Sequence, residues 1–309
     1  MRAIIAVPCI VALVLRAYTR KSLTIIGCLV AGLTASIHAL HPSAIPFTLL
    51  GTFFLLGTSA TKVKHDIKAT LTQSSSGSSG GDGPRTSVQV VANSGCATLL
   101  ILIHVWLYGL GNTTAPQCFG GGTTADILLM GIMANYAAVA ADTFSSELGI
   151  LSKSKPVLIT SLRTVPPGTN GGVTLAGLLA GVGGSAAMAV TSLLLLKFCG
   201  AGQSGRIQTF LLLTALGTAG TLLDSLLGAV LQASVVDRRT GKVVEGLGGA
   251  KVLTKPRQPQ HGAEDAGSKG HETRVINSGK DVLDNNQINL LMASIMTICG
   301  MVVGQLVLM

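Results

Sequence analysis

Charged side chains are scarce in this chain. Asp, Glu, Lys and Arg make up 11% of its 309 residues, whereas a soluble domain carries about 25%. The shortage is uneven, because several long stretches hold no charged residue at all. Hydrophobic residues make up 48% of the chain, and the mean hydropathy is +0.58. This balance excludes an ordinary soluble domain and predicts an integral membrane protein.

Aromatic residues are few as well, at 4%, which leaves little material for the stacking platforms that bind nucleic-acid bases. The net charge of +9 has a simpler origin than nucleic-acid binding. Its Lys and Arg residues gather in the connections between apolar stretches, as the positive-inside rule expects. We therefore expect no nucleic-acid partner.

Patterns of metal ligands and of disulfides are also missing. The six cysteines form no CxxC pair and lie far apart, mostly in apolar stretches, and the six histidines lack metal-ligand spacing. Neither a zinc site nor a disulfide framework is predicted. We expect His38, His41, His261 and His271 to lie at membrane or solvent edges.

What the chain does have is a series of apolar stretches, most of them about as long as a helix that crosses the hydrocarbon core. The sequence predicts an all-α, polytopic membrane bundle with about eight transmembrane helices. Seven lie within residues 1–236, and the last within 287–309. The stretches are residues 3–15, 23–40, 45–60, 88–110, 127–141, 173–196, 210–236 and 288–309.

The polar connections differ in composition. Residues 73–84 are rich in Ser and Gly, which is typical of a flexible linker. Residues 237–286 are rich in Lys, Arg, Gly and Glu and hold few large apolar side chains. Such a segment buries too little apolar surface to offset its chain entropy, so a disordered basic loop is predicted.

The distribution of Lys and Arg predicts the orientation in the membrane. Basic residues concentrate in the loops after the odd-numbered stretches, whereas the even-numbered loops hold only Lys197 and Arg206. The odd-numbered loops, including residues 142–172, are therefore expected in the cytosol. The sequon at Asn112 then falls on the lumenal side. This sequon, with the lack of an acidic-poor, serine-rich leader, favours the endoplasmic reticulum membrane.

The loop at 142–172 combines acids, bases and glycines between two apolar stretches. The carboxylates Asp142 and Glu147 offer the oxygen ligands that Mg²⁺ prefers. The Gly168–Gly172 turn stands directly before an apolar stretch, so its backbone N–H groups and the helix dipole are suited to an anion. It is not a P-loop, and such turns often only connect helices. The residues predicted to bind phosphate or nucleotide are Lys153, Lys155, Arg163, Gly168, Asn170, Gly171 and Gly172.

A third carboxylate, Asp224, lies midway along residues 210–236. A carboxylate at the centre of a bilayer helix costs about 2.5–3.5 kcal/mol, so it usually faces a cavity or a partner. Gly228 shares its helical face, and Asn135 shares that of Asp142. We predict Asp142, Glu147 and Asp224 to be catalytic acids that hold Mg²⁺. The simpler alternatives are a helix cap for Asp142 and an interhelical hydrogen bond for Asp224.

Seven segments of the chain, in the same order, resemble the transmembrane protein 19 family, which includes the plant phytyl-phosphate kinase of tocopherol synthesis. The pair ADTFSSELG and PPGTNGG is the most specific part. The resemblance covers nearly the whole chain from Arg20 onward, apart from residues 237–280. The segments are RKSLTIIGCLVAG, GTSATKVK, SVQVVANSG, ADTFSSELG, VPPGTNGGVTLAGLLAG, LLDSLLGA and LDNNQINLL.

The resemblance implies a nucleotide-dependent kinase that acts on an isoprenoid monophosphate, with CTP as the expected donor. It implicates the acids and glycines named above together with Lys153 and Asn170. Less distinctively, it implicates Lys62, Lys64, Asn93, Asp284 and Asn289. We therefore expect phosphoryl transfer from CTP or another nucleoside triphosphate to a phytyl-type monophosphate, with the lipid tail among the helices. The alternatives are a membrane transporter or lipid carrier without catalysis, and a structural membrane protein.

Overall fold

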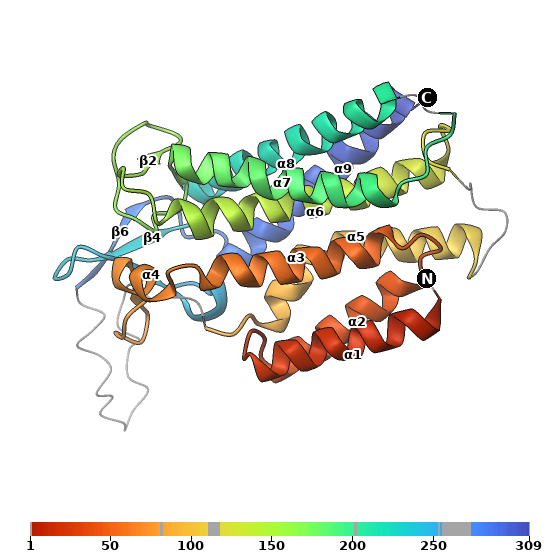
Figure 1. Cartoon of the computed structure of the whole chain (residues 1–309). Helices are drawn as coiled ribbons and strands as arrows, with labels where there is room; N and C mark the ends of the chain where they lie inside the picture. Colours follow the sequence, from red (N-terminus) through yellow and green to blue (C-terminus); the bar gives the residue numbers. More distant parts are fainter. Residues whose placement is uncertain are drawn as a thin grey trace.

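The computed structural model describes residues 2–80, 83–110, 118–200, 203–252, 254 and 273–308. A long helix forms at each of the eight apolar stretches (Figure 1). The short helix α4 (His65–Leu71) lies between the third and fourth of them. The long helices are α1 (Ala3–Thr19), α2 (Ile25–Leu40), α3 (Ile45–Lys62), α5 (Ser87–Tyr108), α6 (Thr124–Gly149), α7 (Leu175–Leu195), α8 (Gln203–Leu231) and α9 (Asn285–Leu308).

The membrane character of the bundle follows from these helices. Five of those described, α5 to α9, are long and apolar enough to cross a membrane. Helices α1 and α2 are apolar but shorter. The chain is thus a helical membrane protein, and a total of about eight spans stays a prediction.

Helix α6 is the centre of the bundle, and nearly all of its first 18 residues are buried. Its neighbours approach it closely through glycines. A Cβ added at Gly217 of α8 would lie 2.7 Å from the Ala137 carbonyl oxygen, and one at Gly184 of α7 would lie 2.7 Å from that of Ala140. Small residues allow such contact between helices in lipid, where no hydrophobic force drives association. The packing of α7 and α8 is therefore fixed by van der Waals contact with α6.

Buried polar side chains tie other helices to α6. The Asn135 amide donates to the Asn93 carbonyl of α5 at 3.0 Å and accepts from Thr297 of α9 at 3.3 Å. The Tyr136 hydroxyl lies 2.6 Å from His38 Nε2 of α2. His38 is fully buried and His41 is 2% exposed, so neither lies at a solvent edge, and both lie at the C-terminal end of α2. His261, His271 and Asn112 lie outside the described residues.

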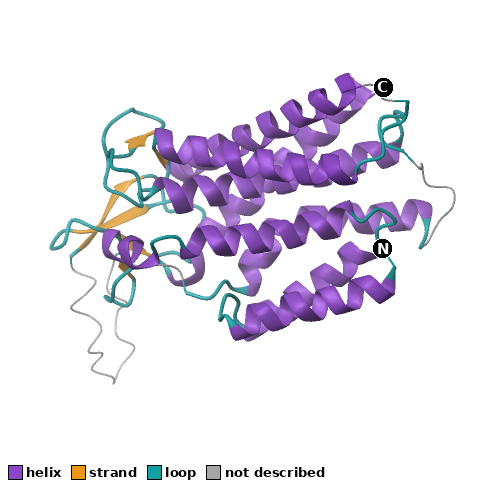
Figure 2. Ribbon diagram, viewed as in Figure 1, coloured by secondary structure: helices purple, strands orange, loops and turns teal. Residues whose placement is uncertain are grey.

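Strands form at one end of the bundle, in segments for which the sequence predicts flexibility or disorder (Figure 2). Strand β1 lies in the 73–84 segment, and β4, β5 and β6 lie at or within the borders of 237–286. Their order in the sheet is β1-β5-β4-β6. The short 3₁₀ helix η1 (Leu247–Gly249) follows β5. The strands are β1 (Gln73–Ser74), β4 (Ser234–Asp237), β5 (Val243–Glu245) and β6 (Arg274–Ser278).

The strands form because the segment does have apolar side chains to bury. Val235, Val243 and Val244 are each about 2–3% exposed, and β-branched valines are favoured in strands. Consequently α8 ends at Leu231, not at 236 as predicted. The 142–172 segment also begins as helix, since α6 continues to Gly149. Its remainder holds the antiparallel pair β2 (Val157–Leu158) and β3 (Gly172–Val173).

The opposite end of the bundle holds a disulfide between Cys118 and Cys199, contrary to the expectation from cysteine spacing. The two loops that carry it meet through backbone bonds: Phe119 N–H donates to the Lys197 carbonyl, and Cys199 N–H to that of Phe119. The cysteines are 81 residues apart, and spacing of that length says nothing about pairing. Only the tertiary fold brings them together.

The disulfide predicts a thiol count. The remaining cysteines, Cys9, Cys28, Cys96 and Cys299, are free. Protein denatured in SDS and treated with a polyethylene-glycol maleimide is expected to gain four adducts, and six after prior reduction, on a mobility-shift gel. A Cys118→Ser, Cys199→Ser double variant should gain four in both cases. Six adducts on unreduced, unmodified protein would contradict the bond.

Candidate functional site

A polar cavity of about 360 Å³ lies at the end of the bundle that carries the strands. Its walls are the C-terminal parts of α3, α6 and α8, the N-terminal parts of α5, α7 and α9, helix α4 and strand β5. Helix termini contribute unpaired backbone groups and polar caps, so this end is hydrophilic. All three predicted catalytic acids, Asp142, Glu147 and Asp224, line it.

Asp142 of α6 and Asp224 of α8 are held at the same level of the bundle by helix packing. A Cβ at Gly220 would lie 2.7 Å from the Ala138 Cβ. Gly220 is one turn before Asp224, and Ala138 is one turn before Asp142, so both carboxylates follow the point of closest approach by one turn. They interact electrostatically. When the Asn289 amide nitrogen faces its two acceptors, Asp224 and the Asn285 carbonyl, it donates to Asp224 Oδ2 at 3.1 Å.

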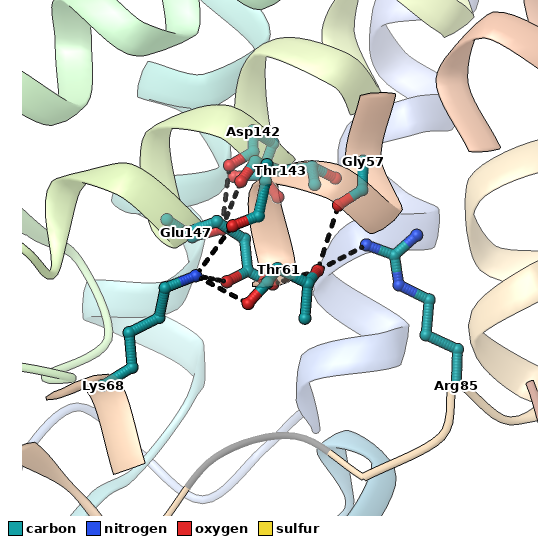
Figure 3. A network of polar contacts seen from close by, with 9 residues as sticks. Gly57, Thr61, Lys68, Arg85, Asp142, Thr143 and Glu147 are labelled. Atoms are coloured by element: carbon teal, nitrogen blue, oxygen red, sulfur yellow. Dashed lines mark hydrogen bonds and ion pairs between the residues drawn. The ribbon is translucent and has the colours of Figure 1, made fainter. Parts of the chain in front are cut away.

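Glu147 belongs to a separate network with α3 and α4 (Figure 3). Its carboxylate accepts from Lys68 Nζ at 2.6 Å and from the Thr61 hydroxyl at 2.7 Å. Lys68 also donates to the carbonyls of Ala60 and Thr61, at 2.9 and 3.0 Å. The three donors of the ammonium group are thus all used within the protein. Glu147 is engaged in an ion pair that anchors α4 to the end of α3.

Arg85 is a cation of the cavity wall that sequence reasoning did not single out. Its backbone is fixed to the start of α2, because Arg85 N–H donates to the Ser22 carbonyl and its carbonyl accepts from Thr24 N–H, each at 3.0 Å. The guanidinium donates to the Thr61 hydroxyl at 3.2 Å (Figure 3). It lies against Gly57, where an added Cβ would be 3.4 Å from it. Lys68 was likewise overlooked, and the sequence holds no motif that marks either residue.

The Gly168–Gly172 turn lines the cavity, but much of its expected phosphate nest is occupied by the protein. The N–H groups of Thr169, Asn170 and Gly172 donate to the Pro166 carbonyl, the Ser234 hydroxyl and the Thr169 carbonyl. These three amides are therefore not available to an anion. The turn instead packs on α8: at Gly171, with φ of +75°, an added Cβ would lie 2.6 Å from the Ser225 carbonyl oxygen.

The other predicted residues fall into three groups. Asn93, Gly228, Asp284 and Asn289 line the cavity. Asn135 is buried between helices, as described above. The predicted cations do not line the cavity and are exposed on loops or helix ends, whereas Ser152 and Ser154, beside Lys153 and Lys155, do line it. These cations are Lys62, Lys64, Lys153, Lys155 and Arg163.

The cavity wall holds more acids than bases. Among the residues that the structure describes, six carboxylates line it (Asp142, Glu147, Asp224, Glu245, Asp281 and Asp284), with three Lys or Arg residues (Lys68, Arg85 and Lys251). Lys68 pairs with Glu147, and Lys251 pairs with Asp281 at 3.1 Å. In the part of the chain that the structure describes, no three His, Cys, Asp or Glu side chains are grouped as a metal site. Glu147 faces a cation, so the described contacts do not group it with Asp142 and Asp224, and a metal site of these acids stays a prediction.

Comparison with known proteins shows relatives over nearly the whole chain. The profile of the family described as "Integral membrane protein DUF92" matches residues 8–297. Protein PGR of Arabidopsis thaliana is 35% identical over 290 residues, which are 91% of this chain and 90% of that protein. No solved structure matches the chain.

Two further relatives match shorter parts. An uncharacterized membrane protein of Methanocaldococcus jannaschii is 45% identical over 104 residues, 34% of this chain and 40% of that protein. Protein VTE6, chloroplastic, of Arabidopsis thaliana is 29% identical over 136 residues, 44% of this chain and 36% of that protein. Together the matches confirm the family resemblance and a multi-pass integral membrane protein.

The buried Lys68–Glu147 ion pair predicts that replacing Lys68 alone destabilises the protein more than replacing both residues. Lys68→Met leaves the Glu147 charge without its cation, and breaking a buried pair costs 3–5 kcal/mol. The Glu147 side chain is 16% exposed, so we expect the lower end, about 3 kcal/mol, measured by SDS unfolding in mixed micelles. The Lys68→Met, Glu147→Gln double variant should recover part of this loss. Equal destabilisation of the single and double variants would contradict the coupling.

The glycine turn predicts that Gly171→Ala disturbs α8. The alanine adds left-handed strain and overlaps Ser225, whereas Gly77, with φ of +88°, has no atom within 4 Å of an added Cβ. Gly77→Ala therefore measures the cost of the left-handed backbone strain without the steric overlap. We expect Gly171→Ala to lower the free energy of unfolding by about 1–3 kcal/mol more than Gly77→Ala, the usual cost of overpacking. Equal losses of unfolding free energy for the two variants in the same SDS titration would contradict this prediction. They would show that the turn accommodates the added methyl group at Gly171.

Proposed function

The chain belongs to the integral membrane protein family DUF92, and from this premise we propose that it is a membrane-embedded kinase for an isoprenoid monophosphate. It would transfer a phosphoryl group from CTP, or another nucleoside triphosphate, to a phytyl-type monophosphate and release the diphosphate. The observation that carries the proposal is the convergence of Asp142 and Asp224, from two helices, with the 168–172 turn in one polar cavity. The kinase member of the resembling family supports the same reaction class.

The charge of the cavity supports a requirement for a divalent cation. A nucleotide and a lipid phosphate are both anionic, and a wall with more carboxylates than cations repels them. Mg²⁺ binds through one or two carboxylates together with waters and substrate phosphates. Asp142 and Asp224 would hold it, which needs no third protein ligand. When bound, the ion would neutralise charge on the transferring phosphoryl group.

The chain's own residues would then do the positioning on which phosphoryl transfer depends. Arg85 would pair with phosphate oxygens, for which a guanidinium is suited. Asn289 would orient the Asp224 carboxylate through its 3.1 Å hydrogen bond. The Lys68–Glu147 pair would keep α4 against α3 and so maintain the wall beside Arg85.

The two ends of the molecule support a cytosolic position for the cavity. Its walls come from the loops after the odd-numbered stretches, which carry most of the Lys and Arg. The disulfide lies in even-numbered loops at the opposite end, and disulfides persist in oxidising compartments such as the lumen of the endoplasmic reticulum. Both features fit an endoplasmic reticulum membrane protein whose cavity meets cytosolic nucleotide.

The proposal predicts Mg²⁺-dependent diphosphate formation that requires both aspartates. Purified protein in nanodiscs would be given γ-labelled CTP or ATP with farnesyl, geranylgeranyl or phytyl phosphate. Asp142→Asn and Asp224→Asn are each expected to lower the rate at least about 100-fold, since each removes an anionic oxygen ligand. EDTA should have the same effect. Thermal unfolding would verify that both variants remain folded.

Asp66→Asn is the matched control, because it is the same chemical change at a fully exposed side chain outside the cavity. It should keep the unmodified rate. Full activity of Asp142→Asn or Asp224→Asn, or equal loss in Asp66→Asn, would overturn the assignment of the acids. Uptake of the lipid phosphates without turnover of either nucleotide would overturn the kinase in favour of a carrier.

A further inference from the structure

A second hollow, of about 70 Å³, lies beside the polar cavity and is lined mostly by apolar side chains, with Arg85, Gln89, Asn93 and Ser94 as its polar lining residues. It is formed by α1, α2, α3 and the start of α5. Figure 1 shows α1 and α2 packed along one side of the bundle, next to α3 and α5. Representative lining residues are Leu13, Val14, Leu50, Gly51, Phe53 and Phe54.

The apolar hollow and the polar cavity share part of their walls. Arg85, Gln89 and Asn93 line both. Gln89 and Asn93 lie one turn apart on α5 and so share a face of that helix, and Arg85 directly precedes the N-cap residue Thr86. The polar and the apolar space therefore adjoin at these three residues, with a guanidinium at the junction.

Arg85 is held at this junction by the backbone contacts and the Thr61 bond described above. A guanidinium is a strong partner for phosphate, which it contacts through several N–H donors. The apolar side of the junction begins at the neighbouring Phe53, Phe54 and Val90. A phosphate beside Arg85 would thus place the atoms attached to it at the mouth of the hollow.

We propose that the hollow binds the head-proximal part of one isoprenoid chain, whose phosphate lies beside Arg85 in the polar cavity. This rests on the proposed function for the identity of the headgroup. Pockets that enclose a drug-sized ligand measure about 300–1,000 Å³, so this smaller hollow suits a single chain, and only its first part. The rest would lie in the bilayer along α1 and α2, where apolar residues such as Val7, Val11 and Leu29 are exposed.

Gly51 offers a way to fill the hollow. A Cβ added there meets only Leu13 Cδ1, at 3.8 Å, so Gly51→Ala fits and Gly51→Leu would extend into the apolar space. Both changes favour helix. Ala31→Leu, on the α2 wall, is a second blocking variant. Thermal unfolding would verify that all three remain folded.

The test is photo-crosslinking in nanodiscs with a farnesyl phosphate that carries a diazirine on its first isoprene unit. Mass spectrometry is expected to find the label on α1, α3 or the start of α5. Gly51→Leu and Ala31→Leu should each lower labelling at least tenfold, and Gly51→Ala should not. Unlabelled farnesyl phosphate should compete, whereas inorganic phosphate should not. Arg85→Met should weaken labelling by the phosphate but not by the corresponding photoreactive farnesol.

Some results would overturn the inference. Labels elsewhere in the chain, unchanged labelling in both blocking variants, or equal competition by two-chained phosphatidic acid would each do so. Diphosphate formation measured in parallel distinguishes a failure of this inference from a failure of the proposed function. Labelling of the hollow without diphosphate formation removes the kinase but leaves the lipid site. Diphosphate formation at the unmodified rate in the blocking variants removes the lipid site but leaves the kinase.

Discussion

The close approach of α8 to α6 is the contact on which the candidate site depends. Lipid gives apolar helices little reason to associate, so their distance is decided by how small the facing residues are. Gly217 and Gly220 face Ala137 and Ala138 across this contact. One turn further on, the same two helices carry Asp224 and Asp142. A larger side chain at either glycine would separate the helices and, with them, the two carboxylates, so the site's geometry is a consequence of packing in the apolar part of the bundle.

The apolar lengths in the sequence were sufficient to place all eight long helices, because a helix that meets lipid must be apolar over most of its length. Composition was a poorer guide in the polar connections. Residues 73–84 and 237–286 look unstructured because their apolar residues are few, yet Val235, Val243 and Val244 are buried in a small sheet. The Cys118–Cys199 bond was unpredictable for a related reason, since two loops that meet only in the folded bundle leave no local pattern.

The candidate site likewise contains residues that the sequence could predict and residues that it could not. Asp224 stood out because an acid inside an apolar stretch is costly unless it faces something polar, and the cavity is what it faces. Lys153, Lys155 and Arg163 were chosen for their closeness in sequence to Asp142, but a turn can direct neighbouring residues to opposite sides. Lys68 and Arg85, from other loops, line the cavity in their place. Nearness along the chain was therefore a weak guide to which cation meets which acid.

The arrangement of charge gives the strongest reason to regard the cavity as a site for a phosphorylated lipid. Its acids exceed its bases, so a bare anion is disfavoured there, and a cation-bound anion is favoured. The principal guanidinium, that of Arg85, lies where the polar wall becomes apolar. This boundary suits an amphiphile, whose charge would lie on the polar side and whose chain would lie on the apolar side. A soluble nucleotide has no apolar chain to place there. Under the proposed function, the cavity would hold a metal-bound phosphate at its aspartates and a lipid phosphate at Arg85, which are the two reactants of a lipid-phosphate kinase.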